Sequence, residues 1–147
     1  MTGDIWYFTL EDSINLLYII MSWDIVLFNS KQRIANVAEI DEQQLVPTNF
    51  CKVFEEYFTN ISVDDNHKEI IGESFSIDYF TDDEHVSNKM VSVYGETGLF
   101  ELIKLAKDHG WQIYDSGLGS MIDLDNPARN GFSDFNNYLN QILESDV

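Results

Sequence analysis

The sequence predicts one domain of the α+β class, and three observations lead to this prediction. Three segments repeat apolar residues with the period of an amphipathic helix, and five show the alternation or the short apolar run of a strand. The two kinds of segment are interspersed along the chain. Of the 147 residues, 44% are hydrophobic, so the chain can bury a core without disulfides or a structural metal.

The predicted helices cover residues 49–60, 99–109 and 134–143. In the first, Phe50, Phe54 and Phe58 recur at the spacing of one helical face, and Thr48 is the expected N-cap. Gly110 is placed to end the second helix, and Ser133 is placed to cap the third. Each of these segments therefore has both a periodic apolar face and a boundary signal.

The predicted strands cover residues 23–28, 74–80, 89–94, 111–114 and 121–124. The apolar run WDIVLF is typical of a central strand, and SFSIDYF alternates as a half-buried strand does. The polar loop 81–88 predicts a hairpin between the second and third strands. The turn 115–120, with Gly117 and Gly119, predicts another between the last two.

From Trp23 the order is strand, helix, strand, strand, helix, strand, strand, helix. Two strand-helix-strand units joined by a hairpin predict a ferredoxin-like split arrangement, an antiparallel sheet with helices packed on one face. Residues 21–147 are expected to form this single α+β domain. Residues 1–20 admit three interpretations: a short helix capped at Thr9, a strand over 16–20, or an appended segment.

Charge is the largest anomaly of composition: 26 Asp and Glu against eight Lys and Arg give a net charge of −18. Nucleic acid and anionic lipid surfaces would repel such a chain, because binding to them relies on Lys and Arg. A basic protein, a cation or solubility alone would each account for the charge. We expect no membrane span, no secretion signal and, with Cys51 the only cysteine, a cytoplasmic location.

The densest polar segment runs from Gly110 to Pro127 and places Asp115, Asp123 and Asp125 around one predicted hairpin. On a strand, Asp123 and Asp125 would project from the same face. Two such carboxylates suit a divalent cation or the acid and base of a hydrolase. Asp-Asn-Pro is also ordinary turn chemistry, and we favour that interpretation. No metal or cofactor is expected at these residues.

A second acidic cluster, Asp82, Asp83 and Glu84, lies in the loop of the first predicted hairpin. It lacks the register of a calcium loop, so it is either a solvated loop tip or a contact for a basic partner. The three histidines are scattered without ligand spacing, and Cys51 is expected to pack rather than to react. No pattern typical of a nucleophile or a dinucleotide site is present in the sequence.

The segments MSWDIVLF, GLFELIKLAKDHG and WQIYDSGLGSMIDLDNP together resemble a type of small acidic bacterial protein of uncharacterised function. In size, acidity and lack of catalytic motifs the chain is also similar to immunity proteins of bacterial toxin systems. That similarity implies a protein that neutralises a toxin by covering its active site.

Three hypotheses of function follow. The first is a non-catalytic, immunity-type or inhibitor protein whose acidic surface binds a basic partner such as a toxin domain, through Asp82, Asp83, Glu84, Asp115, Asp123 and Asp125. The second is a structural or regulatory module without a dedicated ligand, with a homodimer as one form of it. The third is a metal-dependent hydrolase that uses the carboxylates of the second hairpin.

Overall fold

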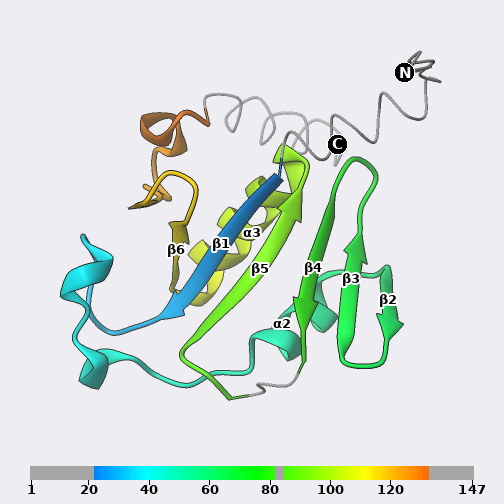
Figure 1. Cartoon of the computed structure of the whole chain (residues 1–147), viewed down its shortest axis with the longest axis horizontal. Coiled ribbons are helices and arrows are strands. Elements are labelled where there is room, and N and C mark those ends of the chain that lie inside the picture. The colour runs from blue at the N-terminus through cyan, green and yellow to red at the C-terminus, as the bar shows by residue number, and fades with distance from the viewer. Residues whose placement is uncertain (1–21, 82–84, 133–147) are drawn as a thin grey trace, which may run out of the picture.

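A computed structural model of the protein describes residues 22–81 and 85–132, which form one antiparallel sheet carrying two α-helices (Figure 1). The strands are β1 (Ser22–Asn29), β2 (Ile61–Asp64), β3 (His67–Ile71), β4 (Ser76–Phe80), β5 (Asn88–Tyr94), β6 (Trp111–Asp115) and β7 (Ser120–Met121). The helices are α2 (Phe50–Tyr57) and α3 (Glu96–His109), with short 3-10 helices η1 (Val37–Glu39), η2 (Glu42–Gln44) and η3 (Pro127–Asn130). The predicted α+β class is confirmed.

The seven described strands lie in the order β2-β3-β4-β5-β1-β6-β7. Every neighbouring pair is antiparallel, and β1 lies between β5 and β6. The central position that the apolar run of β1 predicts is therefore confirmed. So is the hairpin between β4 and β5, in which Ser76 pairs with Tyr94.

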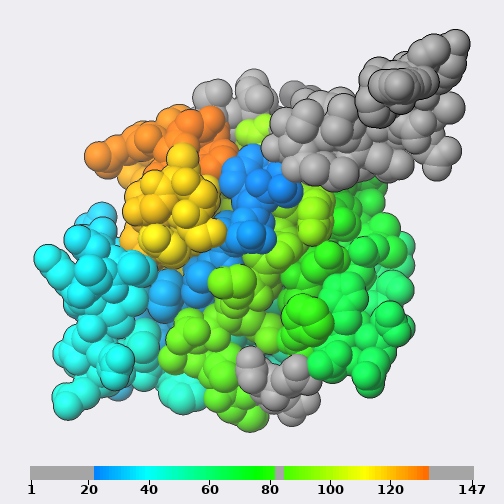
Figure 2. Space-filling model, viewed as in Figure 1, coloured from blue at the N-terminus to red at the C-terminus, as the bar shows by residue number. Residues whose placement is uncertain are grey.

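Among the described residues, helices cover one face of the sheet and leave the other face uncovered. Both α-helices lie behind the strands in the view of Figure 1, and the strands themselves form the surface that faces the viewer in Figure 2. Side chains alternate along β1, so Ile25 and Leu27 are fully buried on the helix side while Asp24 and Val26 point the other way. The core cluster joins the sheet to both helices; its most buried members include Leu27, Phe54, Ile77, Val93, Leu99, Leu102, Ile103 and Ile113.

Helix α2 begins one residue later than predicted. The side chain of Asn49, not Thr48, accepts a hydrogen bond from the amide of Lys52 at 3.0 Å and is the N-cap. The helix ends at Tyr57 rather than Asn60, because the chain turns there into strand β2. The expected apolar face is present, with Phe54 fully buried in the core.

Helix α3 begins three residues before the predicted start. Gly95 precedes it with φ of +95°, a conformation that favours glycine. A Cβ at this position would lie 2.5 Å from the backbone oxygen of Ser74, so the turn into α3 requires the missing side chain. Gly110 ends the helix in the left-handed region, as the sequence predicts.

The β2–β3 hairpin was not predicted. It follows α2 and extends the sheet beyond β4, with Asp64 paired to His67 across the turn. Asp65 in that turn has φ of +57°. Asp and Asn tolerate this conformation better than other residues, so the Asp65-Asn66 pair was the available signal.

Strand β7 is shorter than predicted. It pairs with β6 only through Ser120 and Met121, so the expected strand over residues 121–124 is wrong beyond Met121. Ile122 and Phe132 continue into the core while the chain between them forms a turn and η3. The predicted helix 134–143 and residues 1–20 lie outside the described residues, as does the acidic cluster Asp82 to Glu84.

Candidate functional site

Asp115 is completely buried at the end of β6, opposite Ile25 of β1. Its Oδ1 accepts hydrogen bonds from the amides of Gly117 at 2.8 Å and Leu118 at 3.2 Å. Its Oδ2 is also buried and has no hydrogen-bond partner. This carboxylate holds the β6–β7 turn from inside, and it is not on the surface that a protein partner would contact.

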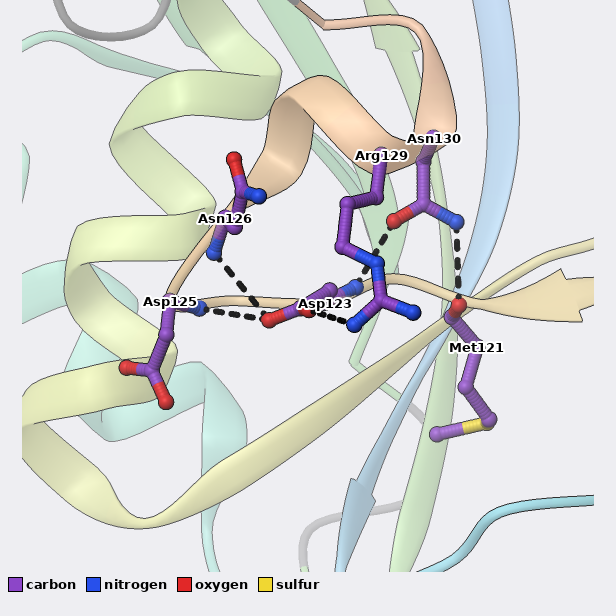
Figure 3. Close-up of polar contacts among 6 residues, drawn as sticks. All are labelled: Met121, Asp123, Asp125, Asn126, Arg129 and Asn130. Atoms are coloured by element: carbon purple, nitrogen blue, oxygen red, sulfur yellow. Dashed lines mark hydrogen bonds and ion pairs between the residues drawn. The ribbon is translucent and has the colours of Figure 1, made fainter.

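Asp123 organises the turn after β7 (Figure 3). Its Oδ1 accepts from the amides of Asp125 and Asn126, both at 3.1 Å, and its Oδ2 is 3.1 Å from the Arg129 guanidinium. The hydrogen bond from the Asn126 amide, supported by the one from Asp125 and by Arg129, lowers the pKa of this carboxyl below its usual value. The turn interpretation therefore describes what the Asp123 side chain does.

Asn130 supports the same turn from η3. Its side-chain oxygen accepts from the amide of Asp123 at 2.8 Å, and its amide group donates to the backbone oxygen of Met121 at 3.1 Å (Figure 3). These bonds satisfy backbone groups that a longer β7 would have paired with a neighbouring strand. The sequence analysis overlooked Arg129 and Asn130, although both follow Asp123 within the same short polar segment.

Asp125 points away from Asp123 and into solvent, with 91% of its side chain exposed (Figure 3). It forms an ion pair with Lys107 of α3 at 3.5 Å. The prediction that Asp123 and Asp125 share one strand face is wrong, because the strand ends at Met121. Within residues 22–81 and 85–132, no group of three His, Cys, Asp or Glu side chains is placed to hold a metal ion.

A hollow of about 710 Å³ lies between this turn and the loop that follows β1. Gln112 of β6 anchors the loop that follows β1, because its side chain bonds the backbone of both Gln32 and Ile34 at 2.8 Å. The lining carries charges of both signs: Lys31, Arg33 and Arg129 are basic, and Asp123 and Asp125 are acidic. No His or Cys lines it among the described residues.

The uncovered face of the sheet, which we name the outward face, carries carboxylates that the sequence analysis did not group. The register places Glu69 of β3 opposite Asp78 of β4, Asp78 opposite Ser92 of β5, and Ser92 opposite Asp24 of β1. These four side chains, the acidic row, therefore cross the sheet side by side. The Ser92 hydroxyl donates to Asp24 at 2.9 Å.

Asp78 lies in an unfavourable electrostatic environment. Burial raises its pKa, and the neighbouring Glu69 carboxylate raises it further, whereas His67 acts in the opposite direction. The Nε2 atom of His67 is 3.8 Å from Oδ1 of Asp78, too far for a hydrogen bond. That Oδ1 atom is buried and has no hydrogen-bond partner in the part of the chain that the structure describes. The acidic row thus contains two adjacent carboxyl groups, and within residues 22–81 and 85–132 the side chain recorded as an ion-pair partner of either is that of His67.

Apolar side chains lie directly beside the acidic row. Phe80, Met90, Val26 and Tyr114 point to the same face from β4, β5, β1 and β6, and we name them the apolar row. Val26 lies opposite both Met90 and Tyr114, whereas Phe80 lies beyond the last β4–β5 pair, Asp78 with Ser92. Met90 is 63% exposed and Phe80 is 56% exposed. On the other side of the acidic row, Ile71 is also exposed.

None of the outward-facing residues of the seven described strands is Lys or Arg. The two strand lysines, Lys68 and Lys89, both point to the helix side, where Lys68 bonds Glu55 of α2. The alternation of SFSIDYF already placed Asp78 on the polar side of its strand. The pairing that brings Glu69 and Asp24 beside it depends on the unpredicted β3 and on the sheet order.

Cys51 is buried beneath the sheet, and burial raises the pKa of its thiol, which suits the predicted packing role. None of the helices that the structure describes is long and apolar enough to cross a membrane.

No known protein family, curated protein or solved structure matches this chain. The similarity to immunity proteins therefore stays a prediction.

Proposed function

We propose that this chain is a non-catalytic protein-binding domain of the immunity or inhibitor type, whose acidic surface neutralises a basic partner such as a toxin domain. The observation that carries the proposal is the outward face, where the strands present carboxylates and exposed apolar side chains and no Lys or Arg. Stable protein interfaces combine apolar contact area with complementary charge, and this face offers both.

Charge favours a protein partner of the opposite sign. With a net charge of −18, the chain attracts basic surfaces at long range and repels nucleic acid. Complementary charge raises association rates to about 10⁸ to 10⁹ M⁻¹s⁻¹ at low salt, and added salt removes much of that gain. A fast, salt-dependent encounter is what an inhibitor of a toxin requires.

Among the predicted contact residues, Asp125 is exposed and remains a candidate, whereas Asp115 is enclosed and Asp123 is engaged in its own turn. Asp82, Asp83 and Glu84 lie outside the described residues and remain a prediction. The hydrolase hypothesis loses the site on which it was based, since Asp115, Asp123 and Asp125 have separate partners.

We also infer a ferredoxin-like split arrangement for the segment from β1 to β6. Two features support this inference: the alternation β1-α2-β4-β5-α3-β6, and the neighbour order β4-β5-β1-β6. The β2–β3 hairpin would then be an insertion between α2 and β4, and β7 an addition at the opposite edge. A cytoplasmic location is part of the same proposal.

The test of the proposed function is capture of a partner from the organism that encodes the chain. The purified full-length protein should retain a basic protein at low ionic strength and release it as salt is added. The recovered protein should lose its activity, toxic or enzymatic, when the chain is added back. Capture that is indifferent to salt, or a partner whose activity is unchanged, would contradict the proposal.

A further inference from the structure

We propose that the outward face is the docking surface for that partner, and that the partner contributes a segment in which arginine side chains alternate with apolar ones. This inference rests on the proposed function and specifies the surface and the chemistry of the partner. It replaces the two hairpin turns, to which the sequence analysis assigned the contact, with the centre of the sheet.

The geometry of the acidic row sets the size of the docked segment. Glu69 and Asp24 are three strand intervals apart, which corresponds to about 14 Å at the usual spacing of neighbouring strands. An extended segment of about four residues, or a helix of about nine, covers such a distance. A short secondary-structure element laid across the strands therefore reaches every carboxylate of the row.

The Glu69–Asp78 pair favours arginine at one end of this segment. The two residues are directly opposite each other on adjacent strands, and Oδ1 of Asp78 has no hydrogen-bond partner. A guanidinium group presents several donors in a planar fork, so it can bond both carboxylates at once, which a lysine ammonium does less well. Such a contact would also relieve the repulsion between the two carboxyl groups.

The apolar row accounts for the apolar residues that we propose between the arginines of the partner segment. Phe80 is two residues from Asp78, and Met90 is two residues from Ser92, so the two rows are about 7 Å apart along the strands. An arginine side chain can rest its methylene stem on such apolar residues while its head reaches a carboxylate. Apolar side chains of the partner, placed between its arginines, would cover the exposed surface of Phe80 and Met90.

Charge argues against the other occupants. A second copy of this chain would bring a net charge of −18 against an acidic row, and like charges across an interface are strongly disfavoured. The same repulsion applies to the phosphates of nucleic acid. A basic, partly apolar segment of another protein is the occupant that matches both rows.

The inference can be tested before the partner is known, with a short synthetic peptide in which arginine and leucine alternate. Titration of the full-length, ¹⁵N-labelled chain with this peptide should shift the amide resonances of β3, β4, β5 and β1 more than those elsewhere. Peptides that alternate arginine with serine, or lysine with leucine, should bind more weakly, and a glutamate–leucine peptide should not bind. Shifts centred on the hollow beside Gln112, or equal binding of the arginine and lysine peptides, would overturn the inference.

Two matched variants separate this inference from the proposed function. The first removes three charges from the outward face, Asp24→Asn, Glu69→Gln and Asp78→Asn; the second removes three exposed charges elsewhere, Glu39→Gln, Glu42→Gln and Glu56→Gln. The outward-face variant should bind the arginine–leucine peptide at least roughly tenfold more weakly than the matched variant. Equal weakening of both would overturn the docking surface, while salt-sensitive capture of a native partner would still support the proposed function.

Discussion

Replacing Asp78 by Asn should stabilise the isolated protein at neutral pH, because the wild-type carboxylate lies in an unfavourable environment. Burial and the Glu69 charge raise the pKa of Asp78 above its ordinary value of 3.8, so the folded protein binds this proton more tightly than the unfolded chain does. The contribution of this carboxyl to stability is therefore fully present below pH 3.8 and is lost as the pH rises through the folded pKa. Asn carries no charge in that range and avoids the loss.

The expected gain is modest. His67 at 3.8 Å and the 25% exposure of the Asp78 side chain both reduce the net effect. We expect about 1 kcal/mol in the free energy of unfolding at pH 7, the upper size that charge interactions reach at partly exposed sites. For a domain of this size that is a rise in Tm of roughly 2 to 4 °C.

The assay is thermal unfolding followed by circular dichroism, from neutral pH down to below 3.8, the ordinary pKa of this group. The difference in stability between Asp78→Asn and wild type should be largest at neutral pH and should shrink as the pH falls. Glu56→Gln, which removes one charge from the exposed side of α2, is the matched control and should show a smaller change. A variant less stable than wild type at pH 7, or a difference independent of pH, would refute the reasoning.

Three further predictions concern the scaffold. Gly95→Ala should destabilise the fold by about 3 kcal/mol, because the new Cβ meets a backbone oxygen at 2.5 Å in a positive-φ conformation. Gly110→Ala has free space around the new Cβ and should cost only about 1 kcal/mol. Equal losses of stability in chemical denaturation would contradict this prediction. Phe54→Ala should cost about 4 kcal/mol, because its fully buried ring packs 5.0 Å from that of Tyr79, and a loss under about 1 kcal/mol would show that the core is misassigned. Asp123→Ala should accelerate hydrogen exchange at the Asn126 amide, and Asp123→Asn should accelerate it less. In the wild type, the protection of this amide from exchange should weaken as the pH falls through the lowered pKa of Asp123. Unchanged exchange in both variants would contradict the turn assignment.

Much of the scaffold could be predicted from local patterns. The apolar run of β1, the alternation of β4 and the phenylalanine face of α2 are each encoded within a few neighbouring residues, and all three elements are present. The segment from Gly110 onward was predicted less well. Its apolar residues continue beyond Met121, but the side chains of Asp123 and Asn130 bind the backbone and end the strand. Side chains that compete with a neighbouring strand for backbone hydrogen bonds are hard to recognise in a single sequence.

The candidate site was beyond local patterns altogether. Asp24, Glu69 and Asp78 are far apart in the sequence and become neighbours only through the order of β1, β5, β4 and β3. Net charge drew attention to carboxylates, but it could not distinguish the enclosed Asp115 from the outward Asp78. Burial and register, which are properties of the whole sheet, decide which acidic side chains point outward.

The central claim is that a basic partner meets the outward face of the sheet. The most direct measurement is the association rate of the captured basic protein with wild type and with the two triple-charge variants, in stopped flow over a range of salt concentrations. We predict that wild type and the matched variant associate quickly at low salt and slow down steeply as salt is added, and that the outward-face variant is slow throughout. Equal rates and equal salt dependence for the two variants would place the contact elsewhere on the molecule.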